Sequence, residues 1–373
     1  MPAGNNLALI RQKRGIAAAA LAAQIGVKRQ TIYAIEAGNY IPNTLVALRL
    51  AEALEVSVED LFTIGEKTRT GVSCEPVDLL VPEHGERLRP NQAVRLGRVG
   101  DRLVGVAASP IPISLPDADG IILNMDRFQR GTVQPLDAKA NRARTVVVAG
   151  CDPGMSVLAR HLVRYGGAEL VVAACSSSQA LSWLKERRVH VAGTHLRDES
   201  TGESNLPAVK KLFPRGGYRV ITFASWEEGL VVAQGNPRRI RGVEDLSRKN
   251  VCFVNRERGA GSRFLLDSLL QKEGIAATAV RGYERIAYGH LAAAWYVRSG
   301  EVDCCIAARA AAQAFGLAFV PLVAERYDLI VPEVHMDSQE VQVMLDMLSR
   351  SSLKRELEAL GGYDTTQTGR LLL

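Results

Sequence analysis

Residues 21–38 read LAAQIGVKRQTIYAIEAG, and this stretch determines the fold expected for the start of the chain. Leu21 and Ile25 fall on one helical face, and Gly26 stands where a helix ends in a left-handed conformation. A second helix with an apolar face follows the turn. The stretch therefore predicts two helices joined by a glycine turn, an arrangement whose second helix enters the major groove in many DNA-binding proteins.

Basic charge is concentrated around this stretch. The chain as a whole has a formal net charge of only +6, so it has no general polyelectrolyte character. Within residues 1–49 the single acidic residue is Glu36. The basic residues of the same segment are Arg11, Lys13, Arg14, Lys28, Arg29 and Arg49. A local basic patch of this kind favours a site-specific DNA-binding regulator over a protein that coats nucleic acid.

Apolar periodicity extends the helical segment further along the chain. An amphipathic helix is predicted over 45–54, after Pro42, and a short helical turn over 58–62. The region 5–64 resembles the lambda-repressor-like, xenobiotic-response-element family of helix-turn-helix domains, and the motif GVKRQTIYAIEAGNYIP makes the match specific. The resemblance implies that DNA is contacted by residues at the start of the second motif helix and one turn further on, namely Lys28, Arg29, Gln30, Thr31 and Tyr33.

One departure from the family concerns phosphate contacts. The family usually starts its first motif helix with Thr and Gln, whose side chains bind phosphates, whereas residues 17–20 are all alanine here. Alanine favours the helix but makes no hydrogen bond to phosphate. We therefore expect weak DNA binding by one domain and a homodimer as the DNA-binding unit. The alternative is a helical protein-interaction module whose basic residues form a solvated face.

The composition of the 373 residues is that of an ordinary globular protein, with 47% hydrophobic and 23% charged residues, enough for two or three domains. No apolar run is long enough to cross a membrane, and the N-terminus lacks the order of basic, apolar and small residues that marks a signal peptide. We expect a soluble, cytoplasmic protein with no membrane partner.

Residues 66–142 have a different residue pattern from the helical segment before them. Short alternating runs such as AVRLGRV (93–99) and RLVGV (102–106) are separated by prolines. Alternation bounded by Pro, Gly and Asp is typical of β-strands. We predict a short β-rich connector over 66–142, and no chemical motif is recognisable in it.

Strands alternate with helices from Arg144 onward. The apolar run TVVVAG (145–150) predicts a buried strand, and Asp152-Pro153 predicts the start of a helix. Repeated units of strand, helix and strand imply a parallel sheet covered by helices, with ligands bound beyond the carboxyl ends of the strands. The predicted fold class is therefore multidomain, with an all-α domain over 1–65, the β-rich connector, and an α/β domain over 143–373.

The loops at those strand ends carry polar residues. They are residues 151–152, 176–178, 194–195 and 255–263. Hydroxyls, glycine N–H groups and helix N-termini that converge on one crevice make a site for an anion. The last loop is the strongest candidate because its glycines allow close backbone approach and its arginines supply positive charge. Ser262 is expected to cap the helix predicted over 264–272. The alternative is a set of purely structural turns between strands and helices.

Residues 144–370 resemble the two-lobed, type II periplasmic-binding-protein-like effector domain that is fused to helix-turn-helix regulators and is related to molybdate-binding proteins. The resemblance is carried by stretches such as VVVAGCDPGMSVLARHL, NRERGAGSR and GGYDTTQTG. The core of the oxyanion loop departs from the family, because Ala260-Gly261-Ser262 replaces Ser-Gly-Thr. The ligand-binding residues that the resemblance implies are Ser176, Ser177, Thr194, His195, Arg256, Gly261, Ser262 and Arg263.

No catalytic or metal site is recognisable in the sequence. The motifs G-x-S-x-G, H-E-x-x-H and G-x-x-x-x-G-K-[ST] are absent, and the six cysteines show no zinc spacing. Most of these cysteines lie in apolar runs, where the thiol behaves as a small hydrophobe. A redox or metal-sensing role for the neighbours Cys304 and Cys305 is the alternative. We predict a protein that is not an enzyme and holds no cofactor.

These observations predict a one-component transcriptional regulator whose partners are double-stranded DNA and a small effector. Molybdate or tungstate is the effector that the resemblance implies. A regulator of a different small molecule, such as a carboxylate, is the first alternative, because guanidinium groups also suit carboxylates. A metabolite-handling enzyme or a cytoplasmic ligand carrier with a DNA-binding appendage is the second.

Overall fold

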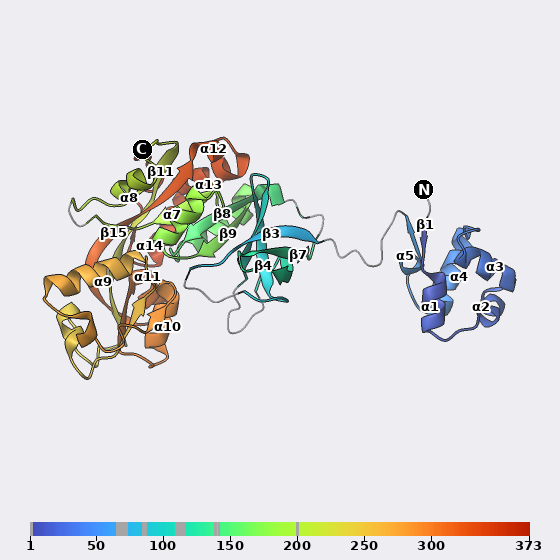
Figure 1. Ribbon diagram of the computed structural model, residues 1–373, viewed down its shortest axis with the longest axis horizontal. Helices are drawn as coiled ribbons and strands as arrows, with labels where there is room; N and C mark the ends of the chain where they lie inside the picture. Colours follow the sequence, from blue (N-terminus) through green and yellow to red (C-terminus); the bar gives the residue numbers. More distant parts are fainter. Residues whose placement is uncertain are drawn as a thin grey trace. The chain divides into compact units, whose positions relative to one another are not determined.

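The N-terminal helices and the later strands belong to different compact units of the chain, whose computed structural model is drawn in Figure 1. The structure describes residues 3–64, 74–83, 88–108, 116–137, 140, 142–198 and 201–373. Contacts divide the chain into the units Met1–Ser73 and Cys74–Leu373. The predicted boundary between residues 65 and 66 lies outside the described residues, and it stays a prediction.

Helices with a shared apolar core form the first unit. Leu21, Ile32, Ile35 and Leu50 are fully buried in it, as the apolar spacing predicts. Gly26 has φ +76° at the end of the first motif helix, a left-handed conformation that glycine adopts without strain. The elements are β1 (Ala3–Asn5), α1 (Leu7–Lys13), α2 (Ala18–Ile25), α3 (Arg29–Glu36), α4 (Thr44–Leu54), α5 (Val58–Leu61) and β2 (Phe62–Ile64). The predicted all-α helix-turn-helix fold is confirmed, with one short pair of strands, β1 and β2, added to it.

A closed barrel of the strands β3-β5-β4-β6-β7 opens the second unit. β3 and β5 run parallel, and the other neighbouring strands run antiparallel. Buried side chains such as Val77, Leu79 and Leu96 fill its interior. The strands are β3 (Glu75–Leu80), β4 (Ala93–Val99), β5 (Arg102–Ala107), β6 (Gly120–Met125) and β7 (Arg130–Pro135). The β-rich character predicted for this segment is therefore confirmed.

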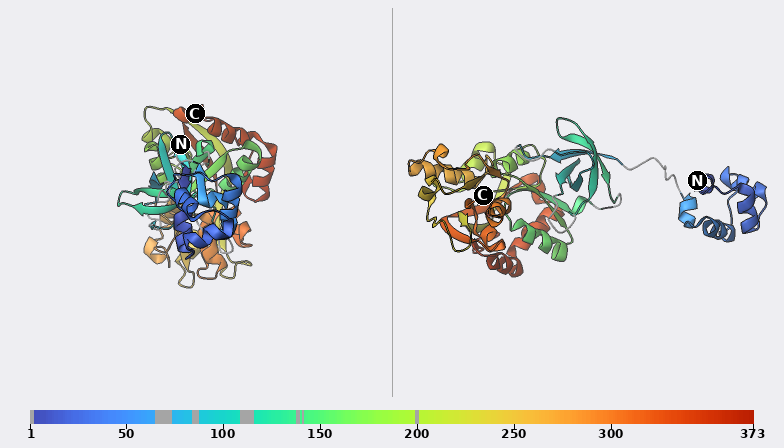
Figure 2. Two further views of the ribbon diagram at one scale, coloured as in Figure 1. Left: turned by 90° about the vertical axis from the view of Figure 1, so that its right-hand side faces the viewer. Right: turned by 90° about the horizontal axis from the view of Figure 1, so that it is seen from below.

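The barrel and the sheet that follows it share one apolar core. Leu80, Val104 and Val106 of the barrel pack in the same cluster as Val147 and Ala149 of strand β8 (Thr145–Gly150). Figures 1 and 2 show the barrel strands beside β8 and β9. The β-rich segment is thus a fixed part of the second unit, although the sequence marks it only as a connector.

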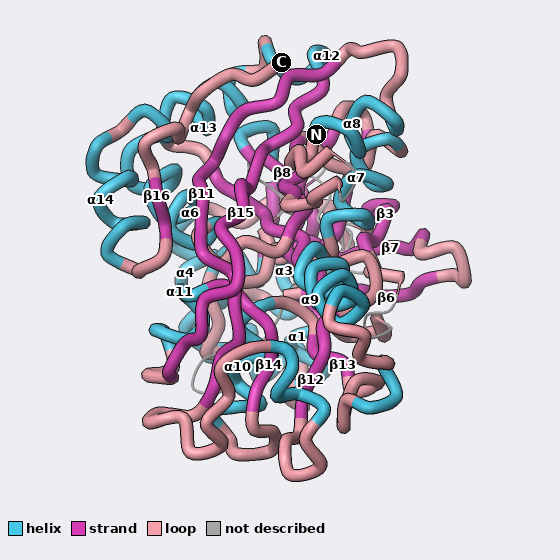
Figure 3. The backbone as a smooth tube through the Cα atoms, turned by 90° about the vertical axis from the view of Figure 1, so that its left-hand side faces the viewer, coloured by secondary structure: helices cyan, strands magenta, loops and turns pink. Residues whose placement is uncertain are grey.

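A nine-stranded mixed sheet runs through the rest of the unit in the order β13-β12-β14-β11-β15-β10-β8-β9, with β16 paired to β11. β11 (Tyr218–Val232) and β15 (Ala318–Pro332) are antiparallel strands of 15 residues that pass through both halves of the sheet (Figure 3). The shorter strands are β9 (Glu169–Ala174), β10 (Val191–Thr194), β12 (Phe253–Arg256), β13 (Ile286–Ala287), β14 (Cys304–Ala308) and β16 (Tyr363–Asp364). This arrangement confirms the predicted two-lobed α/β fold.

Helices cover both halves of the sheet. In the first half α6 (Met155–His161), α7 (Ser177–Lys185), α13 (Gln339–Ser349) and α14 (Ser351–Ala359) bury apolar side chains against it. In the second half α9 (Gly261–Lys272), α10 (His290–Arg298) and α11 (Arg309–Ala314) do the same. The remaining helical segments are α8 (Leu206–Leu212), α12 (Glu333–Met336), η1 (Arg142–Arg144), η2 (Leu162–Gly166), η3 (Val243–Ser247) and η4 (Ala277–Ala279). Within the described part of the chain, every helix is too short or too polar to cross a membrane.

The contact between barrel and sheet gives a first prediction. A Cβ atom at Gly97 of β4 would overlap the side chain of Val147, so Gly97→Val should force the barrel away from the sheet. We expect a loss of about 1–3 kcal/mol in the free energy of unfolding, measured by denaturant titration of the full chain. Arg98→Ala, an exposed change on the same strand, is the control and should have little effect. Equal effects of the two changes would contradict the proposed role of the glycine.

Candidate ligand-binding cleft and DNA-binding helix

A cavity of about 890 Å³ lies where loops of both halves of the sheet meet the barrel. The first half contributes the loops after β8 and β9, including Cys151 and Ser176, and the second half contributes the loop at Gly259 and the start of α10 at His290. The barrel closes a further side. Its lining side chains include Leu80, Pro82, Leu88 and Val106. A volume of this size suits a small organic molecule.

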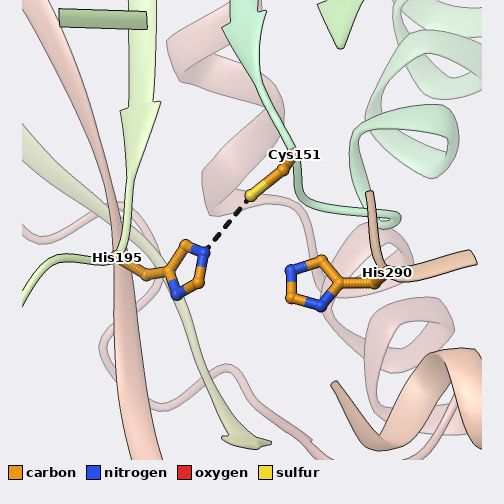
Figure 4. Close-up of side chains that lie close together, drawn as sticks. All are labelled: Cys151, His195 and His290. Atoms are coloured by element: carbon orange, nitrogen blue, oxygen red, sulfur yellow. Dashed lines mark hydrogen bonds between the residues drawn. The ribbon is translucent and has the colours of Figure 1, made fainter. Parts of the chain in front are cut away.

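The thiol of Cys151 lines this cavity, and an imidazole and a carboxylate follow it in a row of short contacts. The Sγ atom of Cys151 lies 3.3 Å from Nε2 of His195 (Figure 4). The other ring nitrogen, Nδ1, lies 2.6 Å from a carboxylate oxygen of Glu325 on β15 and 3.6 Å from one of Glu228 on β11. Cys151 is partly exposed, whereas His195 is 1% exposed. The two long strands therefore position the ring that faces the thiol.

Burial and pairing set the protonation of these groups. Burial alone would lower the pKa of His195, but the neighbouring Cys151 and Glu325 outweigh it and hold this pKa well above the ordinary value. The hydrogen bond with His195 likewise lowers the pKa of Glu325 against the effect of burial. Burial, together with the charge of Glu325, raises the pKa of Glu228 to about 8. At neutral pH the arrangement holds a cationic His195, an anionic Glu325 and a neutral Glu228.

His290 approaches the same thiol from the second half of the sheet. Its Nδ1 atom accepts a hydrogen bond from the backbone N–H of Ala308 at 3.1 Å. Burial lowers the pKa of His290 well below its ordinary value, so the ring is neutral and its hydrogen is on Nε2. Nε2 points toward Cys151 and His195 (Figure 4), and it has no hydrogen-bond partner among the described residues. His290 therefore offers a hydrogen-bond donor to whatever occupies this position.

The same three residues are of the types that bind soft metal ions. One ligand atom from each of Cys151, His195 and His290 lies within 4.8 Å of the others. The hydrogen on Nε2 removes the lone pair with which His290 would bind a metal, and the contact with Ala308 fixes that tautomer. A metal would then meet only Cys151 and His195. The arrangement fits hydrogen bonding to a ligand better than metal coordination.

The predicted ligand residues of the first half lie at or beside this position, but their hydroxyls make internal hydrogen bonds. Ser176 caps helix α7 by accepting from the N–H of Gln179. Ser177 accepts from the backbone N–H of His195 at 3.2 Å. Thr194 donates to Asn205 at 3.1 Å and is fully buried. These hydroxyls hold the loop of His195 in place.

The predicted residues of the second half lie close to His195, and the two arginines have acidic partners. The guanidinium of Arg256 is fully buried and donates to Glu257 at 2.9 and 3.0 Å and to the hydroxyl of Ser262 at 3.3 Å. Arg263 lies 3.6 Å from Asp267 and stacks on an aromatic ring. Gly261 packs so closely on the His195 backbone that a Cβ there would overlap it.

Two details of the loop 255–263 differ from the sequence prediction. Helix α9 begins at Gly261, and Ala260 is its N-cap, so Ser262 is not the capping residue. Ser262 instead accepts from Arg256, which competes with a role as a ligand hydroxyl. The positive charges of Arg256 and Arg263 are compensated inside the protein, by Glu257 and by Asp267, whereas Arg258 is exposed and lines the cavity. An anion would therefore meet Arg258 and neutral donors here.

Several residues of the site carry no recognisable signal in the sequence. Cys151 lies in the predicted strand-end loop 151–152, but no motif marks its thiol, and His290 stands in no motif. Glu325 on β15 lies far in the sequence from Trp226 and Glu228 on β11. A buried carboxyl group in an otherwise apolar strand is the one signal that sequence analysis could have used, because such a group is rarely placed in a core without a partner.

In the first unit, the start of α3 carries exposed polar side chains. Lys28, Arg29 and Gln30 are exposed, and the guanidinium of Arg29 donates to the hydroxyl of Tyr33 at 2.8 Å. Thr31 is half-buried beside them. The only acidic residue of this region, Glu36, is held by Arg11 at 2.6 Å. The positive charge at the start of α3 is therefore free to meet an anionic partner.

Comparisons with known proteins match both units. Residues 7–61 match the helix-turn-helix family model, and residues 159–349 match the family model described as PBP superfamily domain. Over 240 residues the chain is 32% identical to the uncharacterized protein YvgK of Bacillus subtilis, covering 64% of this chain and 77% of that protein. Over 62 residues it is 44% identical to an uncharacterized HTH-type transcriptional regulator of Methanothermobacter thermautotrophicus, covering 16% of this chain and 90% of the relative.

Among solved structures, an ABC-type phosphate transport receptor from Vibrio cholerae aligns with 58% of this chain and 98% of its own length. The sequence identity is 15% and the TM-score is 0.40.

The raised pKa of Glu228 predicts a specific dependence of stability on pH. The ordinary pKa of this carboxyl is about 4.5, and its pKa in the folded state is about 8. Between these two pH values the folded state keeps the carboxyl protonated while the unfolded state ionises it. The folded state then binds more protons, so this group's contribution falls as pH rises through that window. The quantity to compare is the free energy of unfolding of Glu228→Gln minus that of the native protein. This difference should be on the order of 2–4 kcal/mol more positive at pH 9 than at pH 5.

The control for this prediction is the neighbouring residue. Glu227 pairs with Arg309, and the hydrogen bond from that arginine lowers the pKa of Glu227. Glu227→Gln should bring no gain at alkaline pH. Thermal unfolding of both variants between pH 5 and 9 measures the difference, and parallel curves for the two variants would contradict the assignment of a neutral Glu228.

Proposed function

The chain belongs to the PBP superfamily domain family and carries a helix-turn-helix domain at its N-terminus, and on this basis we propose that it is a one-component transcriptional regulator controlled by a small ligand. The helix-turn-helix domain binds operator DNA, and the cleft of the second unit binds the effector. The observation that carries the proposal is the cavity between barrel and sheet, whose inner end holds the free donor of His290.

The DNA-binding role is supported by the surface at the start of α3. Lys28, Arg29 and Gln30 project from the N-terminal end of this helix, where recognition helices contact base edges. Residues 17–20 are alanines that make no phosphate hydrogen bonds, so a single domain holds DNA weakly. We propose a homodimer that reads a repeated or palindromic site with half-sites about one helical turn apart.

The effector is a small organic molecule with an acceptor group such as a carboxylate. The cavity of about 890 Å³ is far larger than a tetrahedral oxyanion needs. Arg256 and Arg263 already have Glu257 and Asp267 as partners, so of the three arginines in this loop only Arg258, which is exposed and lines the cavity, is left to meet a ligand. Molybdate or tungstate is the second candidate, since the resemblance favours it and neutral N–H donors also bind oxyanions.

The barrel offers a route from ligand to DNA-binding domain. Strand β3 ends at Leu80, which lines the cavity, and it begins at Glu75, just after the first unit in the sequence. A ligand that contacts the barrel can therefore favour one arrangement of the two DNA-binding domains in a dimer. Such coupling requires that the ligand bind one dimer geometry more tightly than the other.

The DNA-binding proposal predicts separable effects within α3. Arg29→Ala and Gln30→Ala should each remove about 1–3 kcal/mol of discrimination at one base pair, whereas Lys28→Ala should weaken binding to all sequences alike. Gel-shift titration and footprinting on the protein's own promoter region measure both. Lys13→Ala, an exposed basic change on α1, is the control. Unchanged operator preference in the Arg29→Ala, Gln30→Ala double variant would refute this reading.

The ligand proposal predicts a thermal response in the full chain. A carboxylate or oxyanion at about a thousand times its dissociation constant should add roughly 4 kcal/mol to the free energy of unfolding. His290→Leu should lose most of this response because it removes the free donor, while His335→Leu on α12 should keep it. A panel of molybdate, tungstate, sulfate, phosphate and small carboxylates, followed by calorimetry, identifies the class. A response to molybdate and tungstate alone would favour the oxyanion candidate over the organic one.

A further inference from the structure

Three residues far apart in the sequence meet as a nucleophile, a base and an orienting acid. The sulfur of Cys151 lies 3.3 Å from Nε2 of His195, and Nδ1 of the same ring lies 2.6 Å from Glu325. This is the geometry in which an imidazole activates a thiol, because the carboxylate fixes the ring and stabilises its cationic form.

The imidazole is held rigidly in this position. The indole of Trp226 packs edge-on against the His195 ring with a centroid distance of 5.1 Å. The backbone N–H of His195 is bound by Ser177, and Gly261 packs on its carbonyl oxygen. The ring therefore has little freedom to turn away from the sulfur of Cys151.

A second donor faces the same sulfur. His290 is 1% exposed, its Nε2 hydrogen is unpartnered among the residues described, and it points to the space beside Cys151 (Figure 4). An unpartnered buried N–H group costs free energy unless something accepts its hydrogen. A thiolate, or an oxygen atom bound next to it, would supply that acceptor.

Titratable groups from several elements surround the pair of Cys151 and His195. Glu228 and Glu325 face His195 from β11 and β15, and of these two only Glu325 is charged at neutral pH. Arg256 of β12 also lies near Cys151, and its charge is compensated by Glu257. The other titratable groups near the pair are Cys175 after β9 and Tyr327 on β15, whose pKa values are raised by burial, and Asp152 of the same loop, whose pKa is raised to about 7 by burial.

Cys151 and Cys175 both line the cavity, and of these two cysteines only Cys151 is partly exposed. Cys304 and Cys305 are fully buried in strand β14, and burial raises the pKa of both thiols, so the redox or metal-sensing alternative has no support at that pair.

We propose that Cys151 is a nucleophilic thiolate, paired with the His195 imidazolium, that captures an electrophilic carbonyl compound in the effector cavity. The sulfur lone pair forms a bond to the carbonyl carbon, and the carbonyl π electrons move to oxygen. His195 then transfers its Nε2 proton to that oxygen, giving a neutral hemithioacetal or hemithioketal, and His290 donates a hydrogen bond to it. Reversal of these steps releases the compound, and no other reactant is consumed.

This inference deepens the proposed function by naming the chemical class of the ligand, and it rests on that function only in sharing the cavity. The reactivity of Cys151 is measured without DNA and without the effector. A failed DNA or ligand experiment would therefore leave the thiolate test intact, and a failed thiolate test would leave the regulator with a different ligand.

The experiment measures alkylation of the full chain by iodoacetamide from pH 5 to 9, with each cysteine quantified by mass spectrometry. The rate at Cys151 should rise less between pH 6 and 8 than the rate at the exposed Cys74. At pH 6, Cys151 should react at least about tenfold faster than Cys74. Cys74 serves as the control within the same molecule.

Two variants and one ligand probe test the assigned roles. His195→Gln should restore an ordinary thiol pH profile at Cys151, and Glu325→Gln, which changes a positioning residue, should shift the profile part of the way. Glyoxylate, an aldehyde, should slow alkylation of Cys151 but not of Cys74, and acetate should not.

Three results would overturn the proposal. The first is an alkylation rate at Cys151 of the native protein that rises with pH as steeply as the rate at Cys74. This measurement does not depend on the folding of any variant. The second is a lack of protection by glyoxylate. The third is a bound zinc ion, found by elemental analysis, whose removal by a chelator is required before Cys151 reacts.

Discussion

The pairing of β11 with β15 is the constraint on which the rest of the second unit depends. These two strands cross both halves of the sheet, and their register sets Trp226 opposite Glu325. The register also brings the carboxyl groups of Glu228 and Glu325 to the His195 ring from two different strands. A slip of one residue in either strand would move its carboxyl group to the other face of the sheet. The cleft chemistry is thus a consequence of strand register.

Burial decides which chemistry the cleft can perform. A buried charge without a partner costs several kcal/mol, so each charged group at the inner end of the cleft is paired. The pairs are Arg256 with Glu257 and His195 with Glu325. The first of these pairs neutralises the charge of one arginine in the loop 255–263. The thiol of Cys151, the neutral N–H donor of His290 and the exposed guanidinium of Arg258 belong to residues that line the cavity, and together they suit a polar organic molecule.

Much of the fold could be predicted because its signals are local. Gly26, the apolar spacing around Ile32 and Ile35, and the repeated strand–helix pattern all act over a few residues, and the structure agrees with them. The convergence of the strand-end loops near His195 also followed from the rule for parallel sheets. The packing of the barrel on the sheet did not, because shared burial between Leu80 and Val147 leaves no periodic signal in the sequence.

The sequence by itself therefore determined the helix-turn-helix domain, the two-lobed α/β class and the loops that meet at the cleft, since each depends on short-range periodicity or turn chemistry. Only the tertiary structure decided which side chains face one another. Cys151, His195 and Glu325 are separated by 44 and 130 residues along the chain, and only strand pairing brings them within hydrogen-bond distance. Charge compensation is decided in the same way, because a partner such as Asp267 is selected by geometry and cannot be read from residue type.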